Sequence, residues 1–279
     1  MNKKKVIVTV LLIVFLLVVV VFAAYSGKSN DPKSEDFDWE AAEKKAANKM
    51  FPGIEFGGVI KEIKDPEGNT ISIIKDATDG AIVDLSHLSK KAADMTKNSK
   101  HISDEEIYHL NATDDQKKAI ESVINYITMG GVSKGTAASE FFIRDALAYR
   151  GYDPETIEYA LTHAGVDWDE QAYIQTLILL SKRGISKKDL IDTIIEMGFS
   201  EEVATREASR EDIDYYEQAV AYASHYRFEQ EVQRKINSNY MKYEKKDVKK
   251  MLQRFNFTDK EIKYAVNVVF DKIKAELDD

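Results

Sequence analysis

The sequence predicts a mainly α-helical protein with an N-terminal transmembrane helix, a small β-hairpin region and three tandem three-helix repeats. This prediction depends on a long uncharged run near the N-terminus, one short stretch of β-type residues, and helical patterns that recur along the second half of the chain. The 279 residues contain no cysteine and only four prolines, which argues against a disulfide framework or a loop-rich fold. Hydrophobic residues make up 44% of the chain, which is enough to build a core by packing alone.

The N-terminal segment, residues 1–24, predicts a membrane-spanning helix. Three lysines precede an uncharged run at residues 6–24. At a rise of about 1.5 Å per residue this run reaches about 28 Å, close to the hydrocarbon thickness of a bilayer. Because lysines favour the cytoplasmic side, the N-terminus is predicted inside and the C-terminal body outside the cell. A signal peptide cleaved after Ala23 is the alternative, although the run is long for one.

The net charge of the chain is −9, and without residues 1–24 the remaining body carries −12. Nucleic-acid binding requires a basic face that neutralises phosphates, so we expect no direct nucleic-acid binding. The lack of cysteine excludes thiol catalysis and Cys-ligated metals. No two of the five histidines have the i, i+4 spacing of a helical metal pair. The sequence therefore predicts no metal site and no cofactor.

Composition divides the first half of the body into short regions. Residues 25–50 are predicted as a linker and a short helix, 51–89 as a small β-containing region and 90–114 as a connecting helical segment. The DPEGN sequence at Asp65–Asn69 separates two isoleucine-rich runs and predicts a hairpin turn. Because two strands alone are marginal, this piece is expected to pack either on another part of the chain or on a third strand near Ala81–Leu85.

Acidic residues of the β-containing region also permit a calcium site, or an enzymatic role for this region. The residues concerned are Asp65, Glu67, Asn69, Asp76 and Asp79. They lack the complete spacing of an EF-hand loop, and turn chemistry accounts for the same residue types. Turn formation is therefore the preferred interpretation.

The second half of the chain contains internal repeats. The sequence AIESVINYITMGGVSK aligns with AYIQTLILLSKRGISK at a spacing of 53 residues, and Gly151–Ala172 aligns with Gly198–Ala219 at a spacing of 47. A third copy, YEKKDVKKMLQRFNF, follows ISKKDLIDTIIEMGF by 58 residues. We assign the units to 115–170, 171–217 (degenerate) and 218–279. A single unit of this size buries little surface, so neighbouring units are expected to stack.

Residues at the predicted helix ends support three helices per unit. Ser186 and Thr258 begin capping boxes, and Pro154 lies in the first turn of a helix. Gly151 and Gly198 are expected just past the ends of helices, where positive φ is common.

Catalysis is not predicted, because nucleophile, zinc-protease and phosphate-loop motifs are absent from the sequence. Asp167 and Asp169 could be considered as a general acid and base. Their counterparts in the next unit are Asp214 and Tyr216, so one carboxylate is lost there. A helix cap explains Asp167 and Asp214 better, and no catalytic residue is assigned.

Aromatic residues are the candidates for partner binding. Aromatic side chains are enriched at the energetic centres of protein interfaces. Trp168 and Tyr215 occupy equivalent junctions between units, whereas Tyr159 and Tyr264 are expected in the core. The predicted partner-binding residues are Trp168, Tyr215, Tyr173 and Tyr222.

The repeated pattern resembles the Ltp repeat of host-cell-surface-exposed lipoproteins of Gram-positive cells, which temperate phages carry. The matching residues are Ala119, Tyr126, Met129, Ser133, Lys134, Tyr152, Glu155, Tyr159, Ala160, Asp167, Trp168, Ala172, Phe257, Thr258, Tyr264 and Ala265. The resemblance covers roughly residues 115–270. It implies a helical repeat domain without enzyme activity that blocks injection of phage DNA, with a phage tail or tape-measure protein as partner.

The sequence departs from this family in three respects. The family is tethered through a lipidated cysteine, which this chain lacks, so residues 6–24 would have to serve as the anchor. Arg206 and Glu207 replace a Tyr-Ala pair, and residues 25–110 have no counterpart. Ile194–Ala204 also resembles the loop of ubiquitin-associated domains, which we interpret as convergence of three-helix units. An envelope protein-interaction module without a phage role therefore stays open as the alternative function.

Overall fold

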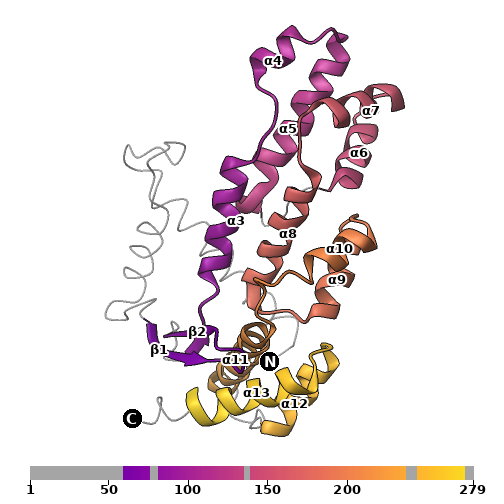
Figure 1. Cartoon of the computed structure of the whole chain (residues 1–279). Helices are drawn as coiled ribbons and strands as arrows, with labels where there is room; N and C mark the ends of the chain where they lie inside the picture. The colour runs from indigo at the N-terminus through magenta and orange to yellow at the C-terminus, as the bar shows by residue number, and fades with distance from the viewer. Residues whose placement is uncertain (1–58, 76–80, 135–138, 237–243, 274–279) are drawn as a thin grey trace. The chain divides into compact units, whose positions relative to one another are not determined.

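The structure is a computed structural model of the whole chain, and it describes residues 59–75, 81–134, 139–236 and 244–273 (Figure 1). The chain divides into two units, Met1–Gly58 and Val59–Asp279, and all described residues belong to the second. The predicted membrane segment and the predicted linker and short helix at 25–50 lie outside the described residues. Within the described ranges, no helix is both long and apolar enough to cross a membrane.

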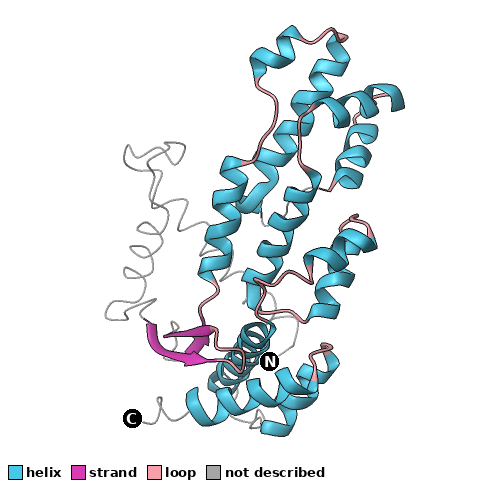
Figure 2. Cartoon of the chain, viewed as in Figure 1, coloured by secondary structure: helices cyan, strands magenta, loops and turns pink. Residues whose placement is uncertain are grey.

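The described part of the chain is mainly helical and contains one small antiparallel sheet, which confirms the predicted class (Figure 2). The sheet has the order β1 (Val59–Lys64), β2 (Thr70–Lys75) and β3 (Ala81–Val83). The predicted hairpin and third strand are therefore both present. Ile63, Ile71, Ile73 and Val83 are buried, because alternate residues of a strand point to the same face.

The turn between β1 and β2 is organised by Asp65, which is 6% exposed. Its carboxylate accepts hydrogen bonds from the backbone N–H of Glu67 at 3.0 Å and of Asn69 at 2.6 Å. It also accepts one from the Asn69 side-chain amide at 3.0 Å. These three hydrogen bonds stabilise the turn. Among the described residues, no cluster of three or more acidic or histidine side chains has the geometry to hold a metal ion.

Two helices follow the sheet, and then a long helix followed by two shorter ones occurs three times in the described part of the chain. The first two are α3 (Ser86–Asn98) and α4 (Asp104–His109). The three successive sets are α5 (Asp114–Lys134), α6 (Glu140–Tyr149) and α7 (Pro154–His163); α8 (Trp168–Arg183), α9 (Lys187–Glu196) and α10 (Glu201–Glu207); α11 (Tyr215–Ile236), α12 (Lys245–Arg254) and α13 (Asp259–Asn267). A single π-helical turn, η1 (Val268–Ile273), continues α13.

Several helix ends lie where the sequence places them. Pro154 is in the first turn of α7, and Gly151 and Gly198 have φ values of +89° and +88°. Thr258 forms a complete capping box, whereas Ser186 accepts only the backbone N–H of Asp189, at 3.1 Å. The predicted capping box at Ser186 is therefore only half formed, and the Asp189 carboxylate accepts a hydrogen bond from the side-chain amide of Asn256 at 2.5 Å.

Three predicted boundaries differ from the helices. α3 begins at Ser86, before the predicted segment 90–114, and its N-cap residue Leu85 provides no side-chain cap. The predicted divisions at 170/171 and 217/218 fall inside α8 and α11, which begin at Trp168 and Tyr215. Each of these helices starts directly after an aspartate, so the helix caps fix the boundaries.

The buried apolar residues form two separate clusters. The larger one contains residues of the sheet and of α3, α8, α9, α11, α12 and α13. The smaller one contains residues of α4, α5, α6 and α7. α11 lies within the larger cluster, where it contacts β3, α8, α12 and α13. The contact with β3 brings the sheet against α11.

Candidate functional site

Asp167 and Asp214 cap α8 and α11 in the same way, as the sequence predicts. Asp167 accepts the backbone N–H groups of Asp169 and Glu170, both at 3.0 Å. Asp214 accepts those of Tyr216 and Glu217 at 2.8 and 3.0 Å. A carboxylate in this position satisfies N–H groups that have no partner within the helix.

Trp168 and Tyr215, the first residues of these helices, pack inward against different cores. Trp168 is half-buried against the smaller cluster, and Tyr215 is half-buried against the larger one. The Tyr215 hydroxyl donates a hydrogen bond to the Ala208 carbonyl at 2.8 Å, and burial raises its pKa above the ordinary value. The structure thus gives both residues packing roles, while their role in partner binding stays a prediction.

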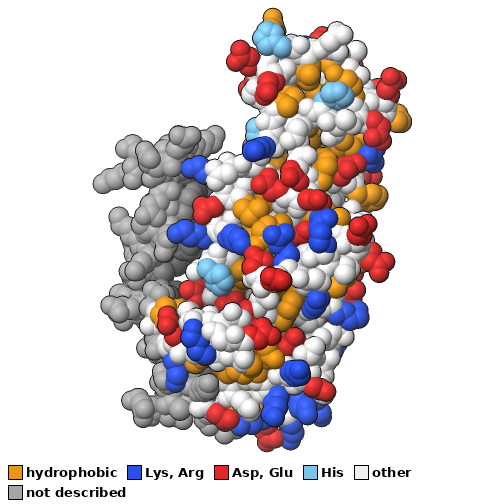
Figure 3. All heavy atoms as spheres, in the orientation of Figure 1, with side chains coloured by type: hydrophobic (Ala, Val, Ile, Leu, Met, Phe, Trp, Pro, Cys, Tyr) orange, Lys and Arg blue, Asp and Glu red, His pale blue; other side chains and the backbone are white. Residues whose placement is uncertain are grey.

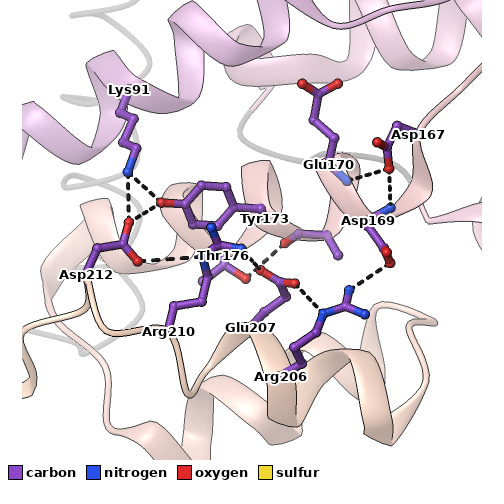
Figure 4. Close-up of polar contacts among 11 residues, drawn as sticks. Lys91, Asp167, Asp169, Glu170, Tyr173, Thr176, Arg206, Glu207, Arg210 and Asp212 are labelled. Carbon is purple, nitrogen blue, oxygen red and sulfur yellow. Dashed lines mark hydrogen bonds and ion pairs between the residues drawn. The ribbon is translucent and has the colours of Figure 1, made fainter.

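Tyr173 lies at the centre of a polar network that joins three parts of the chain (Figure 4). The ring is 7% exposed on α8, and its hydroxyl accepts a hydrogen bond from Lys91 of α3 at 2.5 Å. Asp212 accepts hydrogen bonds from Lys91, at 2.8 Å, and from the Tyr173 hydroxyl. The guanidinium of Arg210 lies 3.7 Å from the ring centre. Tyr173 is therefore buried among residues of its own chain, and this placement offers no support for its predicted binding role.

The network continues through a buried carboxylate. Glu207, 1% exposed, accepts hydrogen bonds from Arg206 at 3.0 Å and from Arg210 at 3.2 Å. Arg206 also donates to Asp169 at 2.7 Å, which ties α10 to the first turn of α8. Asp169 therefore forms an ion pair with Arg206. Arg206, which together with Glu207 replaces Tyr-Ala in this unit, thus connects α10 to α8.

The hydrogen bonds between Lys91, Tyr173 and Asp212 affect the pKa values of the charged pair. Burial opposes ionisation of Asp212, but the hydrogen bonds from Lys91 and Tyr173 lower its pKa below the ordinary value. The hydrogen bond to Asp212 correspondingly raises the pKa of Lys91. At neutral pH the pair is charged and holds α3 to the segment that precedes α11.

Replacing Tyr173 with phenylalanine is expected to lower the free energy of unfolding by about 1 kcal/mol, the typical net value of one hydrogen bond. The loss is small because Lys91 and Asp212 remain paired with each other. Chemical denaturation of the full chain measures it. Tyr149→Phe is the matched control, because Tyr149 is 93% exposed, and equal effects of the two substitutions would contradict the assigned hydrogen bonds.

A second group of carboxylates lies where the sheet meets α11. Glu217 is 7% exposed, and its carboxylate is 3.7 Å from the imidazole Nε2 of His87. Burial, with the nearby charges of Asp214, Asp84 and Asp65, raises the pKa of Glu217 to about 8. Sequence reasoning missed this group because its members are distant in the chain.

Asp214 belongs to the same group, and burial raises its pKa to about 6 in spite of its capping bonds. Both Asp214 and Glu217 line a small cavity of about 180 Å³ beside His87. Carboxylates that are buried close together disfavour the ionisation of one another, because their negative charges repel. The group therefore couples the packing of the sheet on α11 to pH.

Tyr222 lines a groove of about 490 Å³ between the C-terminal end of α8, α11 and α12. Its ring packs on Phe255 and Phe257, with ring centres 4.9 and 5.7 Å away. The Arg183 guanidinium lies 5.4 Å from its ring centre. Of the described features, this groove combines a predicted partner-binding residue with open space, and we take it as the candidate functional site. A signal for it exists in the basic sequence KKDVKKMLQR of α12.

Comparison of the chain with known protein families, with curated proteins and with solved structures finds no match in any of the three.

Proposed function

We propose that the chain is a non-enzymatic binding protein, anchored in the cell membrane by residues 6–24, whose body lies at the extracellular face. The apolar run and its preceding lysines support the anchor and its orientation. The networks around Tyr173 and Glu207 engage their polar groups in contacts between helices, which fits a packing role.

We propose further that residues from Asp114 onward form three copies of one helical unit, of the type found in Ltp-repeat proteins. The observation that carries this proposal is the recurrence of a long helix followed by two short ones, with equivalent aspartate caps at Asp167 and Asp214. The resemblance of the repeated sequence then favours superinfection exclusion, in which the body binds an incoming phage protein and blocks DNA injection.

Phage infection of a sensitive Gram-positive host that expresses the full chain tests this function. We expect normal adsorption of a susceptible tailed phage together with a large fall in plaque number, because the block acts after attachment. A host that expresses the chain without residues 1–24 is the control for anchoring. Unchanged plaque numbers across a panel of tailed phages would contradict the exclusion function.

The aromatic assignment has its own test. Trp168→Ala is expected to weaken exclusion if this side chain contacts the partner, whereas Tyr149→Ala, at an exposed tyrosine outside the predicted set, should not. Circular dichroism of both variants checks that the helices are retained. Full protection by a folded Trp168→Ala variant would remove Trp168 from the partner-binding set.

The absence of the lipidated cysteine favours an alternative function, an envelope protein-interaction module with no phage role. This alternative predicts a growth or envelope defect when the gene is deleted from phage-free cells. Deletion without a defect, together with exclusion of at least one phage, would remove it.

A further inference from the structure

The groove beside Tyr222 carries cations that have no ion-pair partner among the described residues. Arg183, Lys250 and Arg254 line it, and none of the three forms an ion pair with any residue in the described part of the chain. By contrast, Lys245 and Lys246 of the same helix α12 pair with Asp271 and Glu244. The described carboxylates therefore leave these groove cations without an ion-pair partner, which favours an external anion in that role.

The floor of the groove is aromatic and apolar. Tyr222 is only 9% exposed and packs on Phe255, and Met251 lines the same space. The Tyr222 hydroxyl forms no hydrogen bond with any described residue. A buried aromatic surface beside an unused hydroxyl suits a ligand that has an apolar group next to a polar one.

The charge of this region contrasts with that of the whole chain. The chain carries −9, whereas α12 contains five cationic residues and one acidic residue, Asp247. The Asp247 carboxylate accepts the backbone N–H of Glu244 at 2.9 Å, so it serves the start of the helix. In Figure 3, Lys and Arg side chains gather over the helices α12 and α13 at the lower end of the view. An anionic partner would be attracted to this end and repelled by most of the remaining surface.

We propose that the groove between α8, α11 and α12 binds an acidic peptide segment of a partner protein through one apolar side chain. That side chain packs on Tyr222, Met251 and Phe255, and carboxylates on either side of it pair with Arg183 and with the cations of α12. Glu229 and Asp247 also line the groove and would repel an unbroken polyanion such as nucleic acid. The concave shape fits a protruding side chain better than the flat surface of a membrane. This inference rests on the proposed function, because it requires that the chain binds another protein.

Fluorescence anisotropy of the full chain in detergent micelles tests the proposal. The probe is a short labelled peptide of aspartate and glutamate with one central phenylalanine. Two further peptides of equal length replace the phenylalanine with serine or the acidic residues with lysines. We expect the acidic phenylalanine peptide to bind at least about tenfold more tightly than either of the others, and its affinity to fall with added salt. Equal binding of the lysine peptide, or no binding of the acidic one, would overturn the proposal.

Substitutions locate the binding. The double variant Arg183→Gln and Arg254→Gln should weaken binding of the acidic peptide by about tenfold or more. Lys260→Gln removes an exposed cation of the same C-terminal region outside the groove and should leave affinity unchanged. Equal effects of the double variant and of Lys260→Gln would show that net charge, not the groove, determines binding. Competition by phosphatidylglycerol vesicles as effective as that by unlabelled peptide would also overturn the assignment to a protein segment.

The peptide experiment tests the binding groove and the plaque experiment tests the exclusion function, so either can fail while the other succeeds. A chain that binds the acidic peptide through Arg183 and Arg254 but excludes no phage retains this inference and loses the proposed exclusion function. A chain that excludes phage equally well with and without the double substitution, and does not bind the peptide, overturns the inference and keeps the exclusion function.

Discussion

Replacing Glu217 with glutamine is expected to raise the melting temperature of the chain by several degrees near pH 8 and to reduce its dependence on pH. Glu217 is 7% exposed and lies near the charges of Asp214, Asp84 and Asp65, and among the described residues its ion-pair partner is His87. Glutamine keeps the shape of the side chain, removes the charge and adds an amide that can donate to neighbouring carboxylates. The substitution therefore removes an unfavourable buried ionisation.

The direction of the pH effect follows from the two pKa values of this group. Glu217 has an ordinary pKa of 4.5 in the unfolded chain and a pKa of about 8 in the folded one. Between these values the folded chain binds more protons than the unfolded chain, so stability falls as the pH rises. The penalty is complete above about pH 8 and amounts to several kcal/mol, since one pKa unit corresponds to about 1.4 kcal/mol. Asp214, with a pKa of about 6, adds a smaller loss in the same direction.

Thermal unfolding of the full chain from about pH 5 to above pH 8 measures the effect, with the range set by the shifted pKa values. Glu121→Gln is the matched control, because Glu121 lies exposed on α5. At about pH 5 the Glu217→Gln variant and the unsubstituted chain should be similar, since the folded carboxyl is already neutral. A variant that loses stability with rising pH as steeply as the unsubstituted chain would contradict the assigned titration.

Replacing Gly184 with alanine should lower the free energy of unfolding by more than about 3 kcal/mol, among the largest effects of a single substitution. Gly184 ends α8 with φ +87° and ψ 145°, a combination that is essentially restricted to glycine. An added Cβ would lie 2.7 Å from the backbone nitrogen of Tyr222 and closer still to the carbonyl oxygen of Gln218. Because both atoms belong to the backbone of α11, the clash cannot be relieved by rotating a side chain.

Gly151→Ala separates the two contributions to this effect. Gly151 has φ +89°, and no atom lies within 4 Å of the position of its Cβ, so only backbone strain of about 1–2 kcal/mol is expected. Chemical denaturation compares the two variants. If Gly184→Ala and Gly151→Ala lower the free energy of unfolding equally, the close approach of α8 to α11 is contradicted. The groove at Tyr222 would then also be misplaced, because this approach forms part of its wall.

Local sequence signals account for most of the helix ends and for the sheet. Thr258, Asp167 and Asp214 supply side-chain oxygens to N–H groups two or three residues further on, which is a short-range interaction readable from residue spacing. The hairpin turn at Asp65 is readable for the same reason. The capping box at Ser186 is only half formed, and the Asp189 carboxylate accepts a hydrogen bond from Asn256, 67 residues further along the chain, which residue spacing does not reveal.

The surroundings of the aromatic candidates could not be predicted from the local sequence. Tyr173 and Tyr222 are alike in the sequence, since each lies on a predicted helix between two apolar residues. Only the packing of α3, α8 and α11 distinguishes Tyr173, which hydrogen-bonds to Lys91 and Asp212, from Tyr222, which lines a groove. Burial depends on the surfaces that other helices present, and these come from distant parts of the chain.

The sequence by itself determined the helical class, the β hairpin, the order of the helices after Asp114 and most of their caps. Tertiary structure alone decided that Glu217 meets the acidic residues near the sheet, that Gly184 lies against the backbone of α11, and that Arg183 faces α12. The physical reason is range: caps and turns act within a few residues, whereas pKa shifts, close backbone approaches and grooves arise between elements that only folding brings together.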